Sequence, residues 1–352
     1  MSIDAMYEEL RKVYRPDEFP ALAEQIREWR AARPLAGRRV FDATPVFRNT
    51  MMKYVALLAA GAELTVGCGR GIPYDPETVE RLRKFGIRVA DAAALGEPYA
   101  VVLDCAGANA DVKAEFGYVE LTRSGMYRYR DSAQPVFLAD DGRIKEIETA
   151  LGTGDGFRRG MAHFGYGDFS GRNIVVFGCG KVGSGIVMYA AAGGANVTVI
   201  DDAARVKPPF GAAIVDLHDR SGIDRAVRDA WCVVSATGIR GGLAGKFDLA
   251  ALAAGPALIA NMGVEDEFGP GMPAERVLNA KEPLNFALEE PTHMKYIDPT
   301  MALDNYGAAE LLAGTLSPGL NRPRKQLEDQ ILSTVRTAGA VAPELAKLEA
   351  RG

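Results

Sequence analysis

Cysteine and histidine are scarce in this chain, whose 352 residues include four cysteines and three histidines. The cysteines are scattered and form no Cys-x-x-Cys pair. A zinc site needs clustered ligands at short spacing, so we expect no structural metal. Packing explains Cys179, in a glycine turn, and Cys232, in an apolar segment, better than thiol reactivity does.

Long apolar runs and long blocks of one charge are also missing. No run approaches the roughly 18 apolar residues of a transmembrane helix, and the charged amino terminus lacks the apolar core of a signal peptide. The formal net charge of −5 argues against a protein that grips nucleic acid by neutralising phosphates. We therefore expect a soluble cytoplasmic protein with neither a membrane nor a nucleic-acid partner.

The sequence does contain apolar, strand-like segments that alternate with helical ones, in two blocks. In the first block the strands are expected at 38–43, 62–68, 87–91 and 99–105. In the second block they are expected at 173–178, 196–201, 212–217, 231–236 and 256–261. Such alternation predicts parallel sheets with helices on their faces. The fold class is therefore α/β, in two lobes.

We predict that residues 1–160, completed by helices at 317–352, form a smaller α/β domain for substrate and catalysis. Residues 161–316 are predicted to form the second lobe, a Rossmann domain with a doubly wound parallel sheet.

A glycine turn follows the first strand of the second block. Gly178, Gly180 and Gly183 have the spacing Gly-x-Gly-x-x-Gly between a buried strand and a helix. This arrangement lets a pyrophosphate approach the backbone and the amino end of the helix. Asp201, eighteen residues after Gly183, ends the next strand, where a carboxylate accepts ribose hydroxyls and repels a 2′-phosphate. These residues therefore favour binding of NAD over NADP. The alternatives are that the turn binds a flavin or S-adenosylmethionine, or that it binds no ligand and serves packing alone.

Two later strand ends fit the same site, because ligands of open α/β sheets bind at the carboxyl ends of strands. Thr237 follows one of these strands, and residues 261–263 follow the next, near the nicotinamide end. Three acids, Glu265, Asp266 and Glu267, come directly after, and either face the site or are solvated.

The order of these motifs resembles the adenosylhomocysteinase family over most of residues 35–316. The resemblance is clearest at 169–201, 233–238, 259–263 and 55–67. It implies a tightly held NAD that oxidises a sugar hydroxyl of the substrate, after which elimination, addition of water and reduction follow.

The resemblance also implies roles for individual residues. Positions that contact the cofactor in the family are occupied here by Gly178, Gly180, Lys181, Val182, Gly183, Asp201, Thr237, Met262, Gly263 and Asp298. Asp298 stands where the family has an asparagine that contacts the nicotinamide amide. Lys145 stands where the family has its active-site lysine.

The departures from the family pattern concern the substrate. Three family histidines are replaced, the first by Thr44 or Pro45, the second by Val264 and the third by Asn305. These losses remove groups that bind adenosine and move its protons. They predict chemistry on another substrate, or a loss of activity.

Hydride transfer from an alcohol needs a group that takes the hydroxyl proton. Lys145 is the first candidate, because burial beside a cationic ring would lower its pKa; the alternative is an exposed lysine. His293 lies between the domains with two glutamates upstream, and is a general acid or base or a surface histidine. Asp104 ends a strand of the first lobe and is a plausible substrate contact.

Arg48, Asn49 and Thr50 begin a helix after another strand and form a candidate anion site for a substrate carboxylate. Asn305, in place of a family histidine, is assigned to the substrate as well.

Taken together, these features predict an NAD-dependent oxidoreductase of the adenosylhomocysteinase-like type. It would act on a hydroxyl- or amine-bearing carbon of a small polar metabolite, with a recycled NAD or with release of NADH. The alternatives are a catalytically silent NAD-sensing protein and a true adenosylhomocysteinase. We expect a homo-oligomer, a dimer or a tetramer, because related two-lobe dehydrogenases pair through their cofactor domains.

Overall fold

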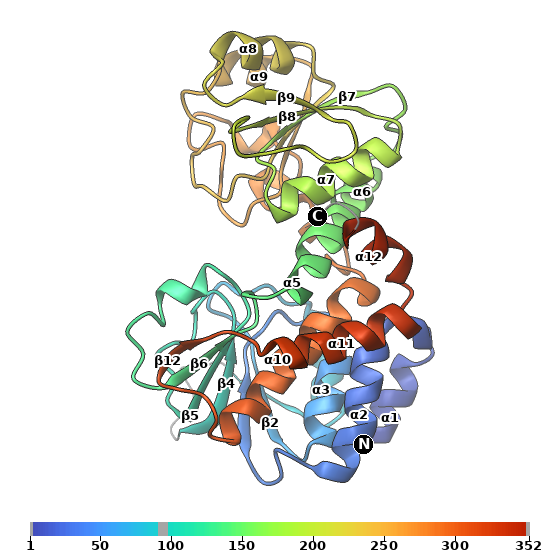
Figure 1. The fold of residues 1–352 in the computed structure, drawn as a ribbon, viewed down its shortest axis with the longest axis vertical. Coiled ribbons are helices and arrows are strands. Elements are labelled where there is room, and N and C mark those ends of the chain that lie inside the picture. Colours follow the sequence, from blue (N-terminus) through green and yellow to red (C-terminus); the bar gives the residue numbers. More distant parts are fainter. Residues whose placement is uncertain (1–2, 91–97, 350–352) are drawn as a thin grey trace. The chain divides into compact units, whose positions relative to one another are not determined.

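The computed structural model describes residues 3–90 and 98–349, and the chain forms two compact units (Figure 1). The first unit contains the chain up to Ile147 and the stretch Met294–Glu349, and the second contains Glu148–His293. Both junctions differ from the predicted boundaries at 160 and 316. The helix Thr153–His163 belongs to the second unit, and the helix Met294–Leu312 belongs to the first.

The first unit is built on a seven-stranded sheet in the order β12-β6-β5-β4-β1-β2-β3. Every pair of neighbours in this sheet is parallel. Its strands are β1 (Arg39–Asp42), β2 (Glu63–Gly67), β3 (Arg88–Ala90), β4 (Tyr99–Asp104), β5 (Ala114–Glu120), β6 (Pro135–Leu138) and β12 (Gly319–Asn321). All six residues of β4 are buried, as expected of a strand covered by helices on both faces.

Helices from both ends of the chain cover this sheet. They are α1 (Ile3–Leu10), α2 (Pro20–Ala32), α3 (Thr50–Ala59), α4 (Pro76–Lys84), α5 (Ile144–Glu146), α10 (Met294–Leu312), α11 (Lys325–Ala338) and α12 (Ala342–Glu349). α10 packs against α2, α3 and α5 as well as strands β4 to β6, so it forms much of the interior of this unit. Among the described residues, no helix is long and apolar enough to cross a bilayer.

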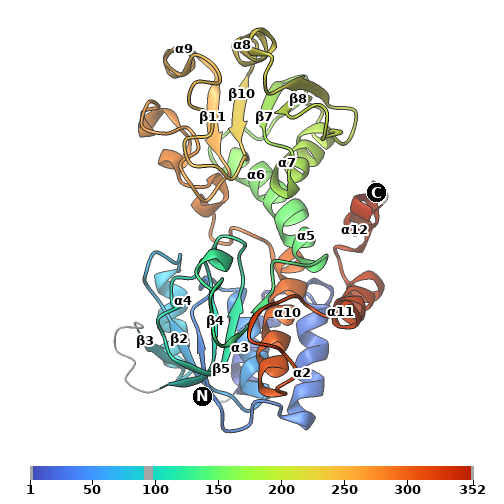
Figure 2. The ribbon, with the colours of Figure 1, turned by 60° about the vertical axis from the view of Figure 1, so that its left-hand side comes forward.

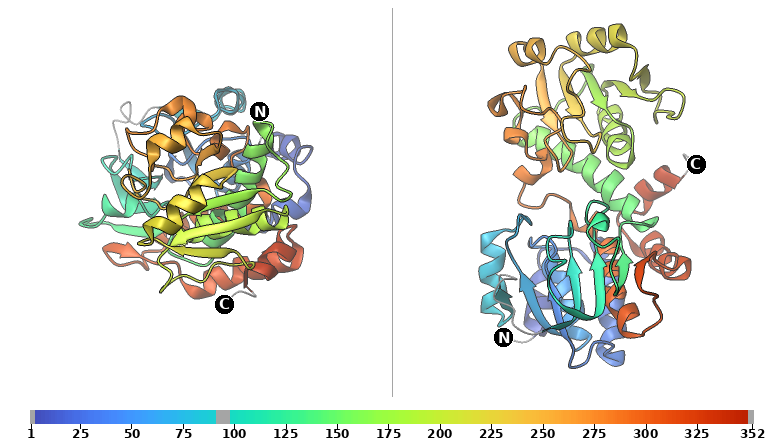
Figure 3. Two further views of the ribbon diagram at one scale, coloured as in Figure 1. Left: turned by 90° about the horizontal axis from the view of Figure 1, so that it is seen from above. Right: turned by 90° about the vertical axis from the view of Figure 1, so that its left-hand side faces the viewer.

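The second unit has a five-stranded parallel sheet in the order β11-β10-β7-β8-β9 (Figure 2). Its strands are β7 (Asn173–Phe177), β8 (Asn196–Asp201), β9 (Ala213–Asp216), β10 (Cys232–Ser235) and β11 (Leu258–Asn261). Its helices are α6 (Thr153–His163), α7 (Lys181–Ala192), α8 (Arg220–Arg228) and α9 (Leu249–Ala254). Two apolar clusters pack on the sheet, which is seen from above in Figure 3. The predicted α/β class and the Rossmann form of the second lobe are confirmed.

Each sheet reverses its strand order at one point. In the first sheet the order reverses between β1 and β4, and in the second between β7 and β10. At such a point the loops after the two strands separate and leave room for a ligand beyond their carboxyl ends. Ligand-binding residues are therefore expected at these two places.

Candidate functional site

The glycine turn lies at the switch point of the second unit, between β7 and α7. Gly178 has φ of 90°, and a Cβ atom there would lie 2.4 Å from the carbonyl oxygen of Ala236. A Cβ on Gly183 would lie 2.0 Å from the carbonyl oxygen of Gly178. A Cβ on Gly180, in contrast, would meet no protein atom within 4 Å. The first and third glycines thus serve the protein's own packing, while the second leaves open space at the start of a helix.

The acid that follows β8 faces this turn. Asp201 accepts a hydrogen bond through Oδ2 from the backbone N–H of Cys179 at 2.6 Å. Its Oδ1 accepts the N–H of Asp202 at 2.7 Å. Lys181, exposed, and Val182, half-buried, open α7, whose amino end carries no side-chain cap in the described structure. The predicted cofactor residues of the turn and the acid are therefore next to one another.

The loop after β10 is held by a buried acid, Glu267. Its carboxylate accepts the N–H of Thr237 at 2.8 Å, the hydroxyl of Thr237 at 2.9 Å and the N–H of Gly238 at 2.7 Å. Burial raises the pKa of Glu267, although these donors oppose the shift. A Cβ on Gly263 would lie 2.0 Å from this carboxylate, which explains the glycine. The hydroxyl of Thr237, a predicted cofactor residue, thus donates a hydrogen bond to Glu267 in this structure.

The loop after β11 is shaped by Asn261. Its amide Nδ2 donates to the carbonyl oxygens of Gly263, Glu265 and Lys281 at 2.7 to 3.0 Å. The side chain of Met262 is buried in the apolar core beneath the sheet, so only its backbone can meet a ligand.

Two exposed apolar side chains stand on these loops, namely Ile239 after β10 and Val264 after β11. The loops are joined by an ion pair of Arg240 with Glu265 and by a hydrogen bond from Gly241 N–H to the carbonyl oxygen of Asp266 at 2.9 Å. Val264 is 80% exposed at a position where the resemblance places a histidine. This edge of the second sheet therefore offers an apolar surface instead of a proton carrier.

In the first unit, Asp104 ends β4 and is fully buried. It accepts hydrogen bonds from the backbone N–H of Cys105, from the backbone and side-chain amides of Asn109, and from the hydroxyl of Tyr129 at 2.6 Å. These bonds hold the loop that folds back over the strand end. Asp104, predicted to contact substrate, is thus engaged within the chain.

Glu120, at the end of neighbouring β5, was not found by sequence reasoning. It accepts the N–H groups of Ala106 and Gly107, each at 3.0 Å, and that of Thr122 at 2.7 Å. Burial raises its pKa to about 7; donors on Thr122 oppose this and the charge of Asp104 adds to it. The sequence signal was present, since Glu120 ends an apolar strand as Asp104 does.

A buried group of charges lies at the carboxyl end of β1. Nζ of Lys53 is 2.6 Å from Oδ2 of Asp42 and 2.6 Å from Oδ2 of Asp304, and all three side chains are at most 2% exposed. Lys53 also donates to the hydroxyl of Thr44 at 3.1 Å. Lys145 is 3% exposed, so of its two predicted states the buried one is correct. We name Asp42, Lys53 and Asp304 the buried charge cluster.

His293, the second candidate for proton transfer, lies in the second unit. Its Nδ1 is 3.2 Å from Oδ2 of Asp155 on α6, and its side chain is 43% exposed. Burial alone would raise the pKa of Asp155, but hydrogen bonds from His293, Arg158 and Arg159 outweigh it and hold that pKa well below its usual range. His293 therefore fastens the end of this unit to α6.

Two residues predicted to meet ligand are used inside the first unit instead. Asp298 lies on α10 and accepts the N–H groups of Ala21 and Leu22, each at 2.9 Å, which caps α2. Asn305 is buried and donates to Gln25 Oε1 at 2.9 Å and to the carbonyl oxygen of Lys53 at 3.2 Å. Both bond to elements of the first unit because α10 packs against α2 and α3, and their predicted contacts with ligand stay predictions.

At the predicted anion site at the start of α3, one of the three residues already bonds within the protein. Thr50 donates to the carbonyl oxygen of Pro45 at 2.9 Å and accepts the N–H of Phe47 at 3.3 Å. Asn49 is buried, while Arg48 is half-buried. The hydroxyl of Thr50 thus shapes the turn, and Arg48 and Asn49 stay candidates for substrate binding.

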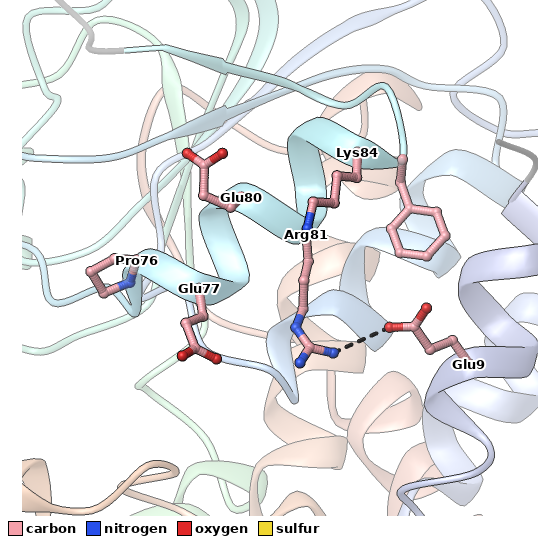
Figure 4. Close-up of a pocket in the computed structure, with 7 residues that line it drawn as sticks. Glu9, Pro76, Glu77, Glu80, Arg81 and Lys84 are labelled. Atoms are coloured by element: carbon pink, nitrogen blue, oxygen red, sulfur yellow. Dashed lines mark hydrogen bonds and ion pairs between the residues drawn. The ribbon is translucent and has the colours of Figure 1, made fainter.

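The first unit also has a surface groove between α1 and α4 (Figure 4). It is lined by Glu9, Pro76, Glu77, Glu80, Arg81, Lys84 and Phe85. The guanidinium of Arg81 crosses it to Glu9 at 3.3 Å. None of the predicted site residues lines this groove, and its charges are largely exposed.

Comparison with known proteins fits this geometry. Residues 166–241, which include the glycine turn and Asp201, match the NAD_binding_7 family, described as "Putative NAD(P)-binding". The adenosylhomocysteinase of Thermoplasma acidophilum is 26% identical over 285 residues, which cover 72% of this chain and 68% of that protein. The S-inosyl-L-homocysteine hydrolase of Methanopyrus kandleri is 26% identical over 65% of this chain and 60% of its own.

The chain is a divergent relative of the adenosylhomocysteinases. This confirms the resemblance predicted from the motifs. Among solved structures, a dipicolinate synthase chain from Bacillus halodurans is similar with a TM-score of 0.52 and 14% identity, covering 80% of this chain and 99% of its own. At that identity the similarity shows the shared two-unit α/β fold alone. In this relative of the adenosylhomocysteinases, the second unit is the NAD(P)-binding domain.

Proposed function

We propose that this relative of the adenosylhomocysteinases is an NAD-dependent oxidoreductase that acts on a hydroxyl- or amine-bearing carbon of a small polar metabolite. The observation that carries the proposal is the open position at Gly180. The protein itself does not require a glycine there, whereas the approach of a pyrophosphate to the helix amino end does. When bound, NAD supplies a hydride acceptor.

The residues of the second unit would bind and orient the cofactor. The N–H groups at the start of α7 would donate to the phosphates. Asp201, already directed at the turn, would accept ribose hydroxyls and repel a 2′-phosphate, which supports NAD over NADP. Glu267 and Asn261 fix the loops after β10 and β11. Those loops would then need little rearrangement when the cofactor binds.

Lys145 is the proposed base for the substrate's proton. Its burial keeps water away from the amine, and a neutral amine can accept a proton from a hydroxyl. The apolar surface at Val264 and the internal use of Asn305 support a substrate other than adenosylhomocysteine. Whether NAD is recycled, whether the protein is a dimer or a tetramer, and its cytoplasmic location stay predictions.

The test begins with the full chain loaded with NAD. The absorbance of NADH at about 340 nm is followed while adenosine, S-adenosylhomocysteine, S-inosylhomocysteine, 2-hydroxy acids and amino acids are added separately. We expect one class to produce NADH. Lys145→Met should bind NAD normally but lose at least about 100-fold in the rate of NADH formation.

Lys113→Met, which changes an exposed lysine of the same unit, is the matched control and should keep the wild-type rate. A chain that is folded but takes up no NAD would refute the proposal. Stable NAD occupancy without NADH from any compound would favour the NAD-sensing alternative.

A further inference from the structure

The loop after β5, residues 121–134, has an excess of positive charge at its start. Arg123, Arg128 and Arg130 are exposed, and the stretch 121–130 contains no acidic residue. Most arginines of the first unit form ion pairs with nearby acids. Arg123 and Arg128 form no ion pair with any residue that the structure describes. The loop therefore carries positive charge that its surroundings do not neutralise.

This loop lies at the carboxyl edge of the first sheet. Asp104, which ends β4, is in register with Glu120, which ends β5, so the two strands finish level with each other. β4 borders the point where the strand order reverses, and open α/β sheets bind ligands beyond such strand ends. The N–H of Ala106, in the loop after β4, donates to the hydroxyl of Thr122 at 2.9 Å. The two loops therefore lie against each other at an edge where a ligand is expected.

Arg128 stands on a fixed part of the loop. It follows the 3₁₀ helix Gly125–Tyr127, and its N–H donates to the carbonyl oxygen of Gly125 at 2.9 Å. The next residue, Tyr129, is buried. A Cβ on Gly107 would lie 2.5 Å from Cγ of Arg128, so the aliphatic stem of the arginine lies on that backbone. Because Arg128 is exposed although its stem is packed, the exposed part is its guanidinium end.

The two acids beneath the loop do not neutralise these arginines. Glu120 and Asp104 are fully buried, and their carboxylates accept hydrogen bonds from the backbone of the same two loops, among them the N–H groups of Gly107 and Asn109. Burial raises the pKa of Glu120 to about 7, so this group is partly uncharged at neutral pH. The exposed guanidinium groups are therefore available to an anion that arrives from solvent.

We propose that Arg123 and Arg128 bind an anionic group, a carboxylate or a phosphate, of the metabolite that the enzyme of the proposed function oxidises. A guanidinium stays charged at all ordinary pH values, and its planar fork of N–H donors matches two oxygens of either group. Arg130, whose Cζ lies 5.7 Å from the ring centre of Tyr127, adds to the local positive potential. The inference rests on the proposed function for the identity of the ligand as substrate. It narrows the substrate class from small polar metabolites to small anionic ones.

The test follows anion binding by the full chain without NAD. The chain is labelled with ¹⁵N-arginine, and the Nε–Hε signals of Arg123 and Arg128 are assigned by their loss in Arg123→Gln and Arg128→Gln. Succinate and inorganic phosphate are the anionic probes, and sodium chloride keeps the ionic strength constant. Succinamide, which resembles succinate in shape but has no charge, is the neutral probe. We expect both signals to shift saturably with at least one anion and with succinamide not at all.

Each single variant then measures the share of the arginine that it lacks. In Arg123→Gln the signal of Arg128 reports the binding, and in Arg128→Gln the signal of Arg123 does. The apparent dissociation constant should rise at least about fivefold in either variant. Arg88→Gln is the matched control, because it removes the same charge from an exposed arginine at the beginning of β3, and it should change the constant less than about twofold.

Two results would overturn the anion site. One is a shift that grows without saturation, and the other is an equal loss of affinity in Arg88→Gln, since both would mean general attraction to positive charge. The two probes also distinguish the source of the anionic group. Tighter binding of phosphate indicates a phosphorylated metabolite, and tighter binding of succinate indicates a carboxylic acid; either supports the site.

The anion site and the proposed function can fail separately. If anions bind but no compound yields NADH, the proposed reaction fails and the anion site stands. If a compound yields NADH but neither anion binds, the anion site fails and the proposed function stands. With a substrate in hand, Arg123→Gln and Arg128→Gln should raise KM at least about fivefold and change kcat less than about threefold, because they bind the substrate and do not react with it. A substrate whose KM is unchanged in both variants would overturn the assignment of the site to the substrate.

Discussion

The three glycines of the turn are equivalent in the motif, but the reasons that exclude a side chain differ between the positions. Gly178 and Gly183 lie where a Cβ would collide with backbone carbonyl oxygens of the protein itself. Gly180 has φ of −68°, which any residue adopts, and free space around its Cβ position. Single-residue substitution can therefore separate folding from cofactor binding.

We predict that Gly180→Ala unfolds at the wild-type temperature yet binds NAD at least about tenfold more weakly, since its methyl group would occupy the path of the pyrophosphate. Gly183→Ala should instead lower the free energy of unfolding by about 1–3 kcal/mol, because the backbone has to shift. Thermal unfolding and calorimetric titration with NAD measure the two effects. Wild-type NAD affinity in folded Gly180→Ala would show that no phosphate approaches this turn.

At the scale of an element, the ends of β4 and β5 are covered by one loop that two carboxylates hold. Asp104 and Glu120 together accept the N–H groups of Cys105, Ala106, Gly107 and Asn109. A Cβ on Gly125 would lie 2.2 Å from the Glu120 carboxylate, so the next turn is fitted to the same group. The stability of the loop should therefore change when Glu120 gains or loses its proton.

We predict that Glu120 makes the protein less stable as pH rises from about 4.5 to about 7. Its pKa in the folded chain is about 7, above the ordinary value of 4.5, so the folded state binds more protons than the unfolded state in this window. The ionised form is thus the costly one, by at most about 3 kcal/mol. Urea unfolding of wild type and Glu120→Gln at several pH values measures the difference.

Glu120→Gln should remove the loss of stability between about pH 4.5 and 7, since glutamine does not titrate. Glu115→Gln changes an exposed residue of the same strand and should leave the wild-type slope intact. Identical slopes for wild type and Glu120→Gln would mean that the carboxylate does not hold a proton in the folded chain.

Elements with local signals could be predicted from the sequence, and those with distant partners could not. The strands at 173–178 and 196–201 and the turn between them follow from apolar runs and glycine spacing, and the structure contains them as β7, β8 and the turn before α7. The hydrogen bonds of Asp298 could not be predicted because its partners, Ala21 and Leu22, lie at the other end of the chain. The same holds for Asn305 with Gln25. Buried acids meet their donors only after folding.

At the scale of the whole molecule, the second unit is one continuous insertion into the first. The chain enters it at Glu148, within a π-helical stretch, and leaves it at His293. Near the entry, Asp155 binds His293, and Arg159 donates to the carbonyl oxygens of Glu290 and Pro291 at 3.0 and 3.2 Å. The two ends of the insertion are therefore fastened to each other by its own residues.

We predict that residues 148–293, produced alone, fold cooperatively and bind NAD within about tenfold of the affinity of the full chain. The turn, Asp201, Glu267 and both apolar clusters lie within this stretch, and so do the bonds that join its two ends. Circular dichroism, thermal unfolding and calorimetric titration measure the outcome. Asp155→Asn in the fragment should lower its unfolding temperature, because the bonds to His293 and Arg159 weaken. The matched control Asp229→Asn, at an exposed residue, should not. A fragment that folds but binds no NAD would place part of the cofactor contact in the first unit, and the Gly180 experiment would then need that unit present.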